Sequence, residues 1–313
     1  MVAAIVCCVN IPELRPGCKP MLSLDSPRWK ELRQAYGTAE AVPELLRAME
    51  KEDAQRVAMT TSGGGSKSVW HDIWSSLCHQ SSVYTATYAA VPYMVSVAEK
   101  GSLTLRLDVL VFCGIVQAFG NLVGGPVPAD LIAEYETSLT KVVEMSRGIV
   151  SDAVREGLLD RFPLNSLVQS LLAIRYGGDA TICILDRLGT GNDEIEVECS
   201  ECGETSFVDL QSIPEDMIDR DSIAQDLKEA MLLVGESTGE PNRDSNEDIG
   251  EGSNNQADET RWSSVSIVQI AAAFAATYGD KDLADKIMLL RAAVACPSCD
   301  HQFMISDGIL WGI

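Results

Sequence analysis

Two cysteine pairs of the form Cys-x-x-Cys constrain the fold of this chain more than any other feature. The first lies in residues 195–207 (IEVECSECGETSF) and the second in residues 294–303 (VACPSCDHQF), and 93 residues separate Cys202 from Cys296. Each pair has an apolar lead-in and an aromatic residue four or five positions after its second cysteine. This pattern is typical of a zinc knuckle, a β-hairpin whose turn presents two thiolates. A structural Zn²⁺ prefers four such ligands in a tetrahedron.

The two pairs together predict one structural Zn²⁺ per chain. We expect Cys199, Cys202, Cys296 and Cys299 to bind it in a discontinuous zinc ribbon, with helices inserted between its halves. Two alternatives stay open: the pairs are redox or incidental cysteines, or His301 replaces one cysteine as a ligand. Ten cysteines in 313 residues do not suit the disulfide framework of a small secreted domain, and several lie in apolar helical stretches. We therefore expect a reducing, cytoplasmic location.

No targeting or membrane segment is expected. The opening MVAAIVCCVN is apolar, but no basic residues precede it and no small-residue cleavage pattern follows it. No apolar run approaches the roughly 18 residues that a membrane-spanning helix needs. We interpret residues 1–20 as an N-terminal extension.

Helical periodicity dominates the rest of the chain and predicts a mostly α fold. In residues 39–49, for example, Val42, Leu45, Leu46 and Met49 form one apolar face. A cap with proline in the first turn is expected at 25–29, where Asp-Ser-Pro occurs. Further helices are predicted at residues 84–99, 103–122, 130–147 and 166–176, with a break or kink at Pro92.

A weak internal repeat favours a HEAT-like α-solenoid of helix pairs. An apolar helix is expected to end at Tyr176-Gly177 and another at Tyr278-Gly279, each followed by a polar turn and a second amphipathic helix. Residues 117–121 resemble a third such helix end. The paired cysteines follow the two tyrosines after 23 and 18 residues. Stacked helix pairs cover each other's apolar faces in a solenoid.

These features predict five parts along the chain. They are the extension 1–20, a helical-repeat region 21–192, a first zinc knuckle 193–213, a helical region 214–293, and a second knuckle with the C-terminus at 294–313. Residues 236–260 have no aromatic residue and a single isoleucine. A segment of this composition cannot bury enough apolar surface to fold, so we expect a disordered acidic loop there.

The charge is concentrated in one segment. The chain has a formal net charge of −22, and residues 193–259 contribute −18 of it, from 21 acidic and 3 basic side chains. Nucleic-acid binding needs lysine and arginine, and none follows Arg291. We exclude nucleic acid and membrane as partners and expect a basic protein partner, with the oligomeric state left open. The candidate acidic contacts are Glu194, Glu196, Glu198 and Glu201.

Residues 70–95 (WHDIWSSLCHQSSVYTATYAAVPYMV) are rich in tryptophan, tyrosine and histidine. Core packing and a partner-binding face both fit this composition. A metal site at His71, Asp72 and His79 is a further alternative, as is catalysis by Cys78. No residue that would orient a catalytic base is evident beside Cys78. The candidate partner-binding residues are Trp70, His71, Asp72, Trp74, His79 and Tyr84.

The same stretch resembles a motif of bacterial helical-repeat proteins. The matching segments are 70–80, 83–84 and 88–92, together with 24–29, 35–37 and 42–46, which resemble that family's opening helix. The family comprises HEAT-like immunity-type proteins associated with polymorphic toxin systems. The resemblance spans roughly residues 22–125 and implies a non-enzymatic, partner-binding protein, without assigning roles to single residues.

Our leading hypothesis is therefore a non-enzymatic immunity protein that binds and neutralises a basic bacterial toxin domain. The first alternative is a helical-repeat scaffold or adaptor protein. The second is a cysteine-dependent hydrolase that uses Cys78.

Overall fold

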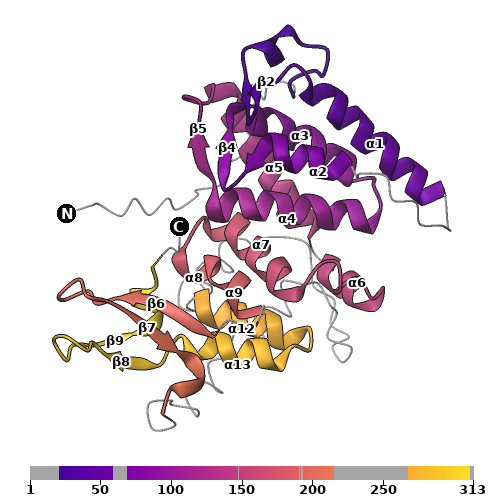
Figure 1. The fold of residues 1–313 in the computed structure, drawn as a ribbon. Coiled ribbons are helices and arrows are strands. Elements are labelled where there is room, and N and C mark those ends of the chain that lie inside the picture. The colour runs from indigo at the N-terminus through magenta and orange to yellow at the C-terminus, as the bar shows by residue number, and fades with distance from the viewer. Residues whose placement is uncertain are drawn as a thin grey trace, which may run out of the picture. The chain divides into compact units, whose positions relative to one another are not determined.

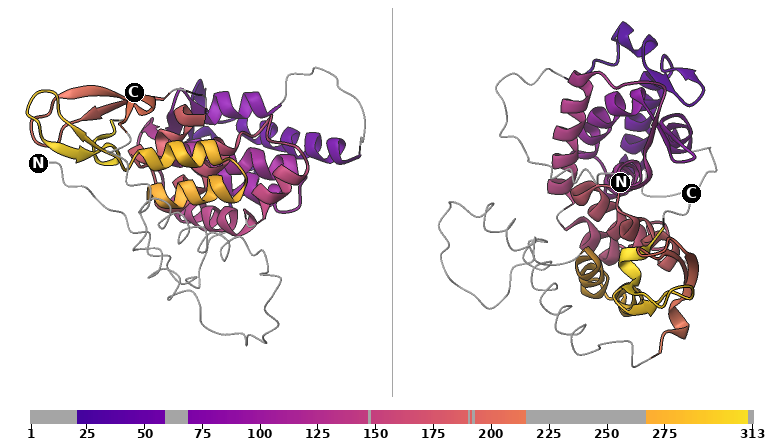
Figure 2. Two further views of the ribbon diagram at one scale, coloured as in Figure 1. Left: turned by 90° about the horizontal axis from the view of Figure 1, so that it is seen from below. Right: turned by 90° about the vertical axis from the view of Figure 1, so that its left-hand side faces the viewer.

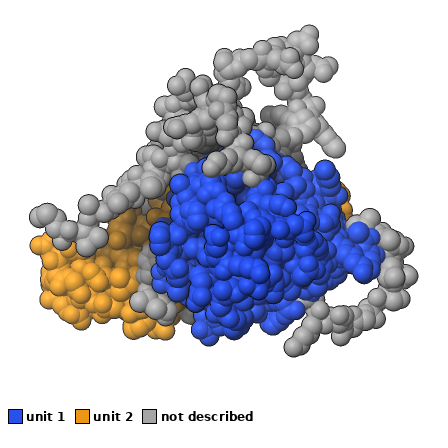
Figure 3. Space-filling view, turned by 90° about the horizontal axis from the view of Figure 1, so that it is seen from above, with its two compact units in different colours: residues 1–149, 173–178 blue, residues 150–172, 179–313 orange. Residues whose placement is uncertain are grey.

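The computed structural model describes residues 21–58, 69–146, 148–189, 191, 193–214 and 267–310. The described fold is mostly helical with small sheets, so the predicted fold class is confirmed at that level, while solenoid stacking stays a prediction (Figure 1). The predicted extension 1–20 and acidic loop 236–260 lie outside the described residues. The chain forms two compact units, residues 1–149 with 173–178 and residues 150–172 with 179–313 (Figure 3).

The first unit holds helices and short strands in alternation. Its helices are η1 (Pro27–Lys30), α1 (Val42–Ala58), α2 (Val69–Leu77), α3 (Thr85–Ala98), α4 (Leu103–Phe119) and α5 (Ala129–Met145). Its strands are β1 (Arg33–Gln34), β2 (Gly37–Thr38), β3 (Cys78–His79), β4 (Ser82–Tyr84) and β5 (Asn121–Val123). The expected cap is confirmed, because the Ser26 side chain accepts a hydrogen bond from the backbone N–H of Arg28 at the start of η1.

Helix α3 is the centre of the first unit. Its sequence is apolar on almost every side, which is typical of a buried helix, and α1, α4 and α5 pack around it (Figure 1). Pro92 lies inside α3 and starts no new helix. Two threonines at its start fix the neighbouring strands: Thr85 Oγ1 accepts from the Arg33 N–H, and Thr87 Oγ1 donates to the Leu77 carbonyl.

A tight hairpin lies within residues 70–95, the aromatic stretch that the sequence analysis treats as a candidate site. Helix α2 ends at Leu77, and β3 pairs with β4 in an antiparallel register that joins Cys78 to Val83. The two turn residues, Gln80 and Ser81, have φ values of 48° and 60°. Positive φ at both central residues is the geometry of a type I′ turn, which glycine or asparagine normally occupies. Because Gln80 and Ser81 are neither glycine nor asparagine, no turn signal marks this hairpin in the sequence.

The second unit holds the other helices of the described residues and two further hairpins. Its helices are α6 (Ile149–Arg155), α7 (Leu164–Tyr176), α8 (Ala180–Cys183), α9 (Leu185–Gly189), η2 (Leu210–Ser212), α12 (Ile267–Thr277), α13 (Lys281–Leu289) and α14 (Ile305–Gly308). The unit boundaries fall within α6 and α7. Its strands are β6 (Glu194–Glu198), β7 (Thr205–Asp209), β8 (Ala293–Ala295) and β9 (Gln302–Met304), which the views in Figure 2 show beside the helices.

Buried amides on α7 support the break between α8 and α9. Asn165 Nδ2 donates to the carbonyls of Leu185 and Asp186, and Gln169 Nε2 donates to those of Ile182 and Cys183. Both side chains are almost fully buried. Because buried carbonyls without partners are costly, these two amides stabilise the interrupted helix.

The two predicted Tyr-Gly helix ends are confirmed. Helix α7 ends at Tyr176 and α12 ends one residue before Tyr278, and the glycines that follow have φ values of +83° and +93°. The left-handed conformation at these positions favours glycine. The third proposed end differs, because Gly120 has φ −63° and leads into strand β5 instead of a second helix.

Within the described part of the chain, no helix combines the length and the apolar character needed to cross a membrane.

Candidate metal centre

Two short antiparallel hairpins carry the four predicted ligands. Strands β6 and β7 pair along five residues, from Glu194 opposite Asp209 to Glu198 opposite Thr205. Strands β8 and β9 pair along three, from Ala293 opposite Met304 to Ala295 opposite Gln302. Each Cys-x-x-Cys occupies the turn of its hairpin, and Figure 1 shows the two turns on the same side of the second unit.

The two turns have the same backbone hydrogen bonds. The N–H groups of Cys199 and Cys296 donate to the carbonyls of Glu204 and His301, each at 2.9 Å. In return, the N–H groups of Gly203 and Asp300 donate to the carbonyls of Cys199 and Cys296. Gly203 and Asp300 both have positive φ, at 73° and 59°. The glycine meets this requirement without strain, and aspartate is among the few other residues that tolerate it.

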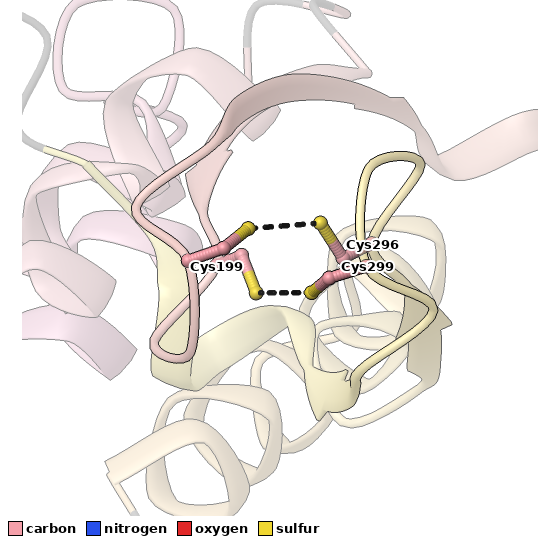
Figure 4. Close-up of side chains that lie close together, drawn as sticks. Cys199, Cys296 and Cys299 are labelled. Atoms are coloured by element: carbon pink, nitrogen blue, oxygen red, sulfur yellow. Dashed lines mark hydrogen bonds between the residues drawn. The ribbon is translucent and has the colours of Figure 1, made fainter.

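The turns bring the four sulfur atoms together. All four Sγ atoms lie within 4.8 Å of one another, although they come from segments almost 100 residues apart. The Sγ of Cys199 lies 3.7 Å from that of Cys299, and the Sγ of Cys202 lies 3.6 Å from that of Cys296 (Figure 4). Each of these contacts joins the two hairpins. The predicted cluster is therefore confirmed.

The sulfur spacing fits a tetrahedral thiolate site. A Zn–S bond of about 2.3 Å gives an S···S edge of about 3.8 Å in a regular tetrahedron. The two cross-hairpin distances of 3.7 and 3.6 Å agree with that edge. A disulfide would need about 2.05 Å, and all four cysteines are free thiols. Cys199 and Cys296 are buried, whereas Cys202 and Cys299 are exposed, so one side of the cluster faces solvent.

The thiols differ in their acidity. The pKa of Cys296 is lowered to about 7, first because the backbone N–H of Ser298 donates to its Sγ at 3.4 Å. For Cys299, the backbone N–H of His301 lowers the pKa, but desolvation and the neighbouring thiols outweigh it and raise the pKa to about 12. Once one thiol has ionised, its negative charge opposes the ionisation of its neighbours. A coordinated dication removes this conflict, because it stabilises all of the thiolates.

A short C-terminal segment joins the two hairpins. Helix α14 follows β9 directly, Ile309 bridges to Val197, and the Leu310 N–H donates to the Glu196 carbonyl. Gly308 is buried at this junction. A Cβ at residue 308 would lie 2.6 Å from Cε2 of Phe303 and 2.9 Å from the Glu198 carbonyl oxygen. The close approach of the hairpins thus requires glycine.

Gly308→Ala is expected to lower the free energy of unfolding by about 1–3 kcal/mol, the usual cost of overpacking a filled core. The added methyl group meets the backbone oxygen of the first hairpin, so zinc retention is expected to fall with it. Thermal unfolding and metal content of the purified variant measure both effects. Ser306→Ala on the same helix is the control and is expected to resemble wild type; an unchanged Gly308→Ala protein would contradict the packing argument.

An ion pair anchors the first hairpin to the helices. Lys286 Nζ on α13 lies 3.2 Å from Oδ1 of the buried Asp193, just before β6. The side-chain amide of Gln211 donates to Asp193 Oδ2 and lowers the pKa of that carboxyl first, with Lys286 adding to the effect. Asp193 in turn raises the pKa of Lys286. Asp193 thus links the start of β6 to Gln211 after β7 and to Lys286 on α13.

His301 lies outside the four-cysteine cluster, and the two phenylalanines that follow the cysteine pairs differ in exposure. The Nε2 of His301 lies 3.5 Å from the Ser200 hydroxyl, and its ring stacks on Phe303. Phe303 is buried, but Phe207 is 65% exposed. The knuckle pattern treats the two phenylalanines as equivalent, yet a shift of one residue places them on opposite faces of their hairpins. Exposure of Phe207 is the site feature that the sequence analysis missed.

The candidate residues of the aromatic stretch fall into two groups. Trp70 and Trp74 are partly buried and make edge contacts with the buried ring of Phe112, at centroid distances of 6.1 and 4.9 Å. His71 and Asp72 are exposed on α2. His79 and Tyr84 are partly exposed on β3 and β4, and the His79 ring lies 5.6 Å from that of Tyr36. His71, Asp72 and His79 form no metal-type cluster among the described residues.

Cys78 lies in a setting that disfavours nucleophilic catalysis. Its side chain is 8% exposed, and burial raises the pKa of its thiol to about 11. A catalytic cysteine needs a lowered pKa and access to substrate. Cys113 on α4 is fully buried, and burial raises its pKa to about 12.

Cys78 and Cys113 are accordingly expected to react slowly with iodoacetamide in the native protein. At pH 8 their raised pKa values leave almost no thiolate, and burial blocks the reagent. Peptide mapping of the alkylated protein, with urea-unfolded protein as the reference for full reactivity, measures the protection. Rapid labelling of native Cys78 would restore it as a candidate nucleophile.

Comparison of the chain with protein-family models, with curated proteins and with solved structures gives no match.

Proposed function

We propose that this protein is a non-enzymatic immunity protein that binds and neutralises a basic toxin domain. The observation that carries the proposal is the charge of the first hairpin and its flanks. Residues 194–214, which follow the buried and ion-paired Asp193, contain six carboxylates and no lysine or arginine. A surface of one sign attracts a partner of the other sign, speeds its encounter and rejects wrong partners. The family resemblance of residues 22–125 supports the same class of function.

We also propose that one structural Zn²⁺ joins the two hairpins. Cys199, Cys202, Cys296 and Cys299 would hold it, and their four thiolates close the coordination shell. A closed shell leaves no position for substrate or water, so the metal would serve as a cross-link between two distant parts of the chain. By holding the hairpins together, the metal would fix the position of the acidic first hairpin, which we propose contacts the partner.

The buried thiol of Cys78 favours this proposal over the hydrolase alternative. Its pKa of about 11 is the opposite of what an activated nucleophile requires. Recognition of a partner needs no such group. The remaining alternative, a scaffold or adaptor protein, shares the architecture and differs only in what the partner does.

The test is affinity capture from the native cell, followed by co-expression. The proposal expects a basic protein that stops growth when expressed alone and is harmless when this chain is co-expressed. The Cys78→Ala variant is expected to protect equally well. A captured partner without toxicity would favour the scaffold alternative, and loss of protection by a folded Cys78→Ala protein would favour the hydrolase. The proposal expects cytoplasmic protein in cell fractions.

A further inference from the structure

One face of the first hairpin presents an aromatic ring to solvent. Side chains alternate along a strand, so the even-numbered residues of β6 share a face with the odd-numbered residues of β7. On this face Glu196 lies directly opposite Phe207, and Glu198 lies opposite Thr205. The other face carries Ile195 and Val197, which are fully buried. Phe207 is 65% exposed in mid-strand. Single exposed apolar side chains are common on protein surfaces, so the groups around this ring decide whether it can serve as a contact surface.

Carboxylates lie on the strand that faces the exposed ring. Glu196 is its cross-strand partner, Glu194 and Glu198 are its diagonal neighbours, and such neighbours lie within reach of long side chains. Glu194 also faces Asp209 directly, an arrangement of like charges that lowers sheet stability. The carboxylate of Asp209 accepts hydrogen bonds from the Gln211 N–H and the Ser212 hydroxyl, so it is engaged locally.

Glu196 and Glu198 are the carboxylates available to a ligand. Within the part of the chain that the structure describes, neither side chain forms a hydrogen bond or an ion pair. Both have solvent access, Glu198 more than Glu196. The hairpin therefore combines two carboxylates that have no partner among the described residues with an exposed aromatic ring.

The second hairpin provides an internal comparison. Alignment of the two Cys-x-x-Cys turns places Met304 at the position of Phe207, and Met304 is also exposed, at 43%. Its cross-strand partner is Ala293, where the first hairpin has Glu196. Exposure of an apolar side chain thus occurs on both hairpins, but only the first combines an aromatic ring with facing carboxylates.

We propose that Phe207, Glu196 and Glu198 form a docking surface for an arginine side chain in a basic segment of the partner protein. A planar guanidinium can stack on the phenyl ring while it donates paired hydrogen bonds to a carboxylate. A lysine ammonium group is expected to interact more weakly with the ring and with the carboxylate, because it is a compact and strongly hydrated charge. This inference rests on the proposed function and assigns that function a contact surface.

Charge selects this occupant over a second copy of the chain. In a two-fold symmetric contact the same patch would meet itself, so that the carboxylates of one copy would face those of the other. An acidic ligand or nucleic acid meets the same repulsion. A basic segment gains from the ring and from both carboxylates.

Fluorescence anisotropy with two labelled hexapeptides, Arg-Gly repeats and Lys-Gly repeats, tests the surface on the zinc-loaded full chain. The arginine peptide is expected to bind more tightly than the lysine peptide. Phe207→Ala is expected to weaken arginine-peptide binding by about two- to fivefold, the range of an exposed cation–π contact. The Glu196→Gln/Glu198→Gln variant is expected to weaken arginine-peptide binding further, because it removes both negative charges of the surface.

Matched variants separate a local contact from general attraction to an acidic protein. Met304→Ala makes a similar apolar truncation on the other hairpin, and Glu40→Gln/Glu99→Gln makes the same charge change at exposed positions of the first unit. Both controls are expected to bind the arginine peptide like wild type. Metal content of each variant verifies that the hairpins remain assembled. Equal binding by Phe207→Ala and Met304→Ala would overturn the proposed surface.

Capture experiments distinguish failure of this surface from failure of the proposed function. If a toxic basic partner binds wild type and the Phe207 and Glu196/Glu198 variants equally, the immunity function stands and the docking surface is wrong. If no toxic partner is captured but binding of the arginine peptide depends on Phe207, the docking surface stands and the immunity function is wrong.

Discussion

Protein purified without added metal is expected to contain one Zn²⁺ per chain, and the variant with Cys199, Cys202, Cys296 and Cys299 replaced by serine is expected to contain none. The reason is geometric: four free thiols lie within 4.8 Å of one another in two turns of the same backbone geometry. Metal analysis by mass spectrometry gives the stoichiometry. Cys183→Ala, which removes a half-buried cysteine elsewhere in the second unit, is the control and is expected to retain the metal.

Loss of the metal is expected to have a large effect on the second unit. Binding of structural zinc contributes roughly 10–16 kcal/mol of apparent free energy in zinc-finger peptides, where folding and binding are coupled. Here the hairpins are also anchored by Lys286 and by α14, so part of the fold is expected to survive chelation. Hydrogen exchange should therefore increase most in β6–β9 and α14. Equal zinc in the wild type and in the serine variant would refute the site.

The ligands of this site were predictable from sequence because their spacing is a local property. A Cys-x-x-Cys that follows an apolar segment and lies in a turn can be recognised without knowledge of the tertiary structure. The same is true of the glycines that follow α7 and α12. Two ligand pairs of the same form, in a chain that lacks the features of a disulfide scaffold, were sufficient to predict that they meet. Apolar periodicity likewise predicted most of the helices.

Features that depend on one residue of register were not predictable. Phe207 and Phe303 follow their cysteines by five and four residues, and strand alternation converts that difference into exposure of one ring and burial of the other. Asp300 adopts the conformation for which Gly203 gives a clear signal. The hairpin after Leu77 turns at Gln80 and Ser81, which carry none of the usual turn signals. At these positions the residue type alone does not indicate the backbone conformation or the exposed face.

Phe112→Ala is expected to destabilise the first unit by about 3–5 kcal/mol, the usual cost of truncating a buried aromatic residue. Phe112 is fully buried, and the rings of Trp70 and Trp74 both pack their edges against it. For a unit of this size the midpoint temperature is expected to fall by on the order of 10 °C. Thermal unfolding followed by near-ultraviolet circular dichroism measures the change and also reports loss of the fixed tryptophan environment. Tyr36→Ala, at a side chain that is 65% exposed, is the control and is expected to change little.

Trp74→Ala then decides between the two roles that the sequence left open for this stretch. Because the Trp74 ring lies 4.9 Å from the Phe112 ring and is only partly exposed, we expect its loss to act on stability, with a smaller effect than Phe112→Ala. Truncating an interface anchor acts differently: it speeds dissociation of the partner and leaves the melting temperature of the free protein nearly unchanged. Measuring both quantities on Trp74→Ala separates the cases. A stable Trp74→Ala protein with faster dissociation would place the partner on α2; a less stable one with unchanged dissociation leaves the first hairpin as the contact surface.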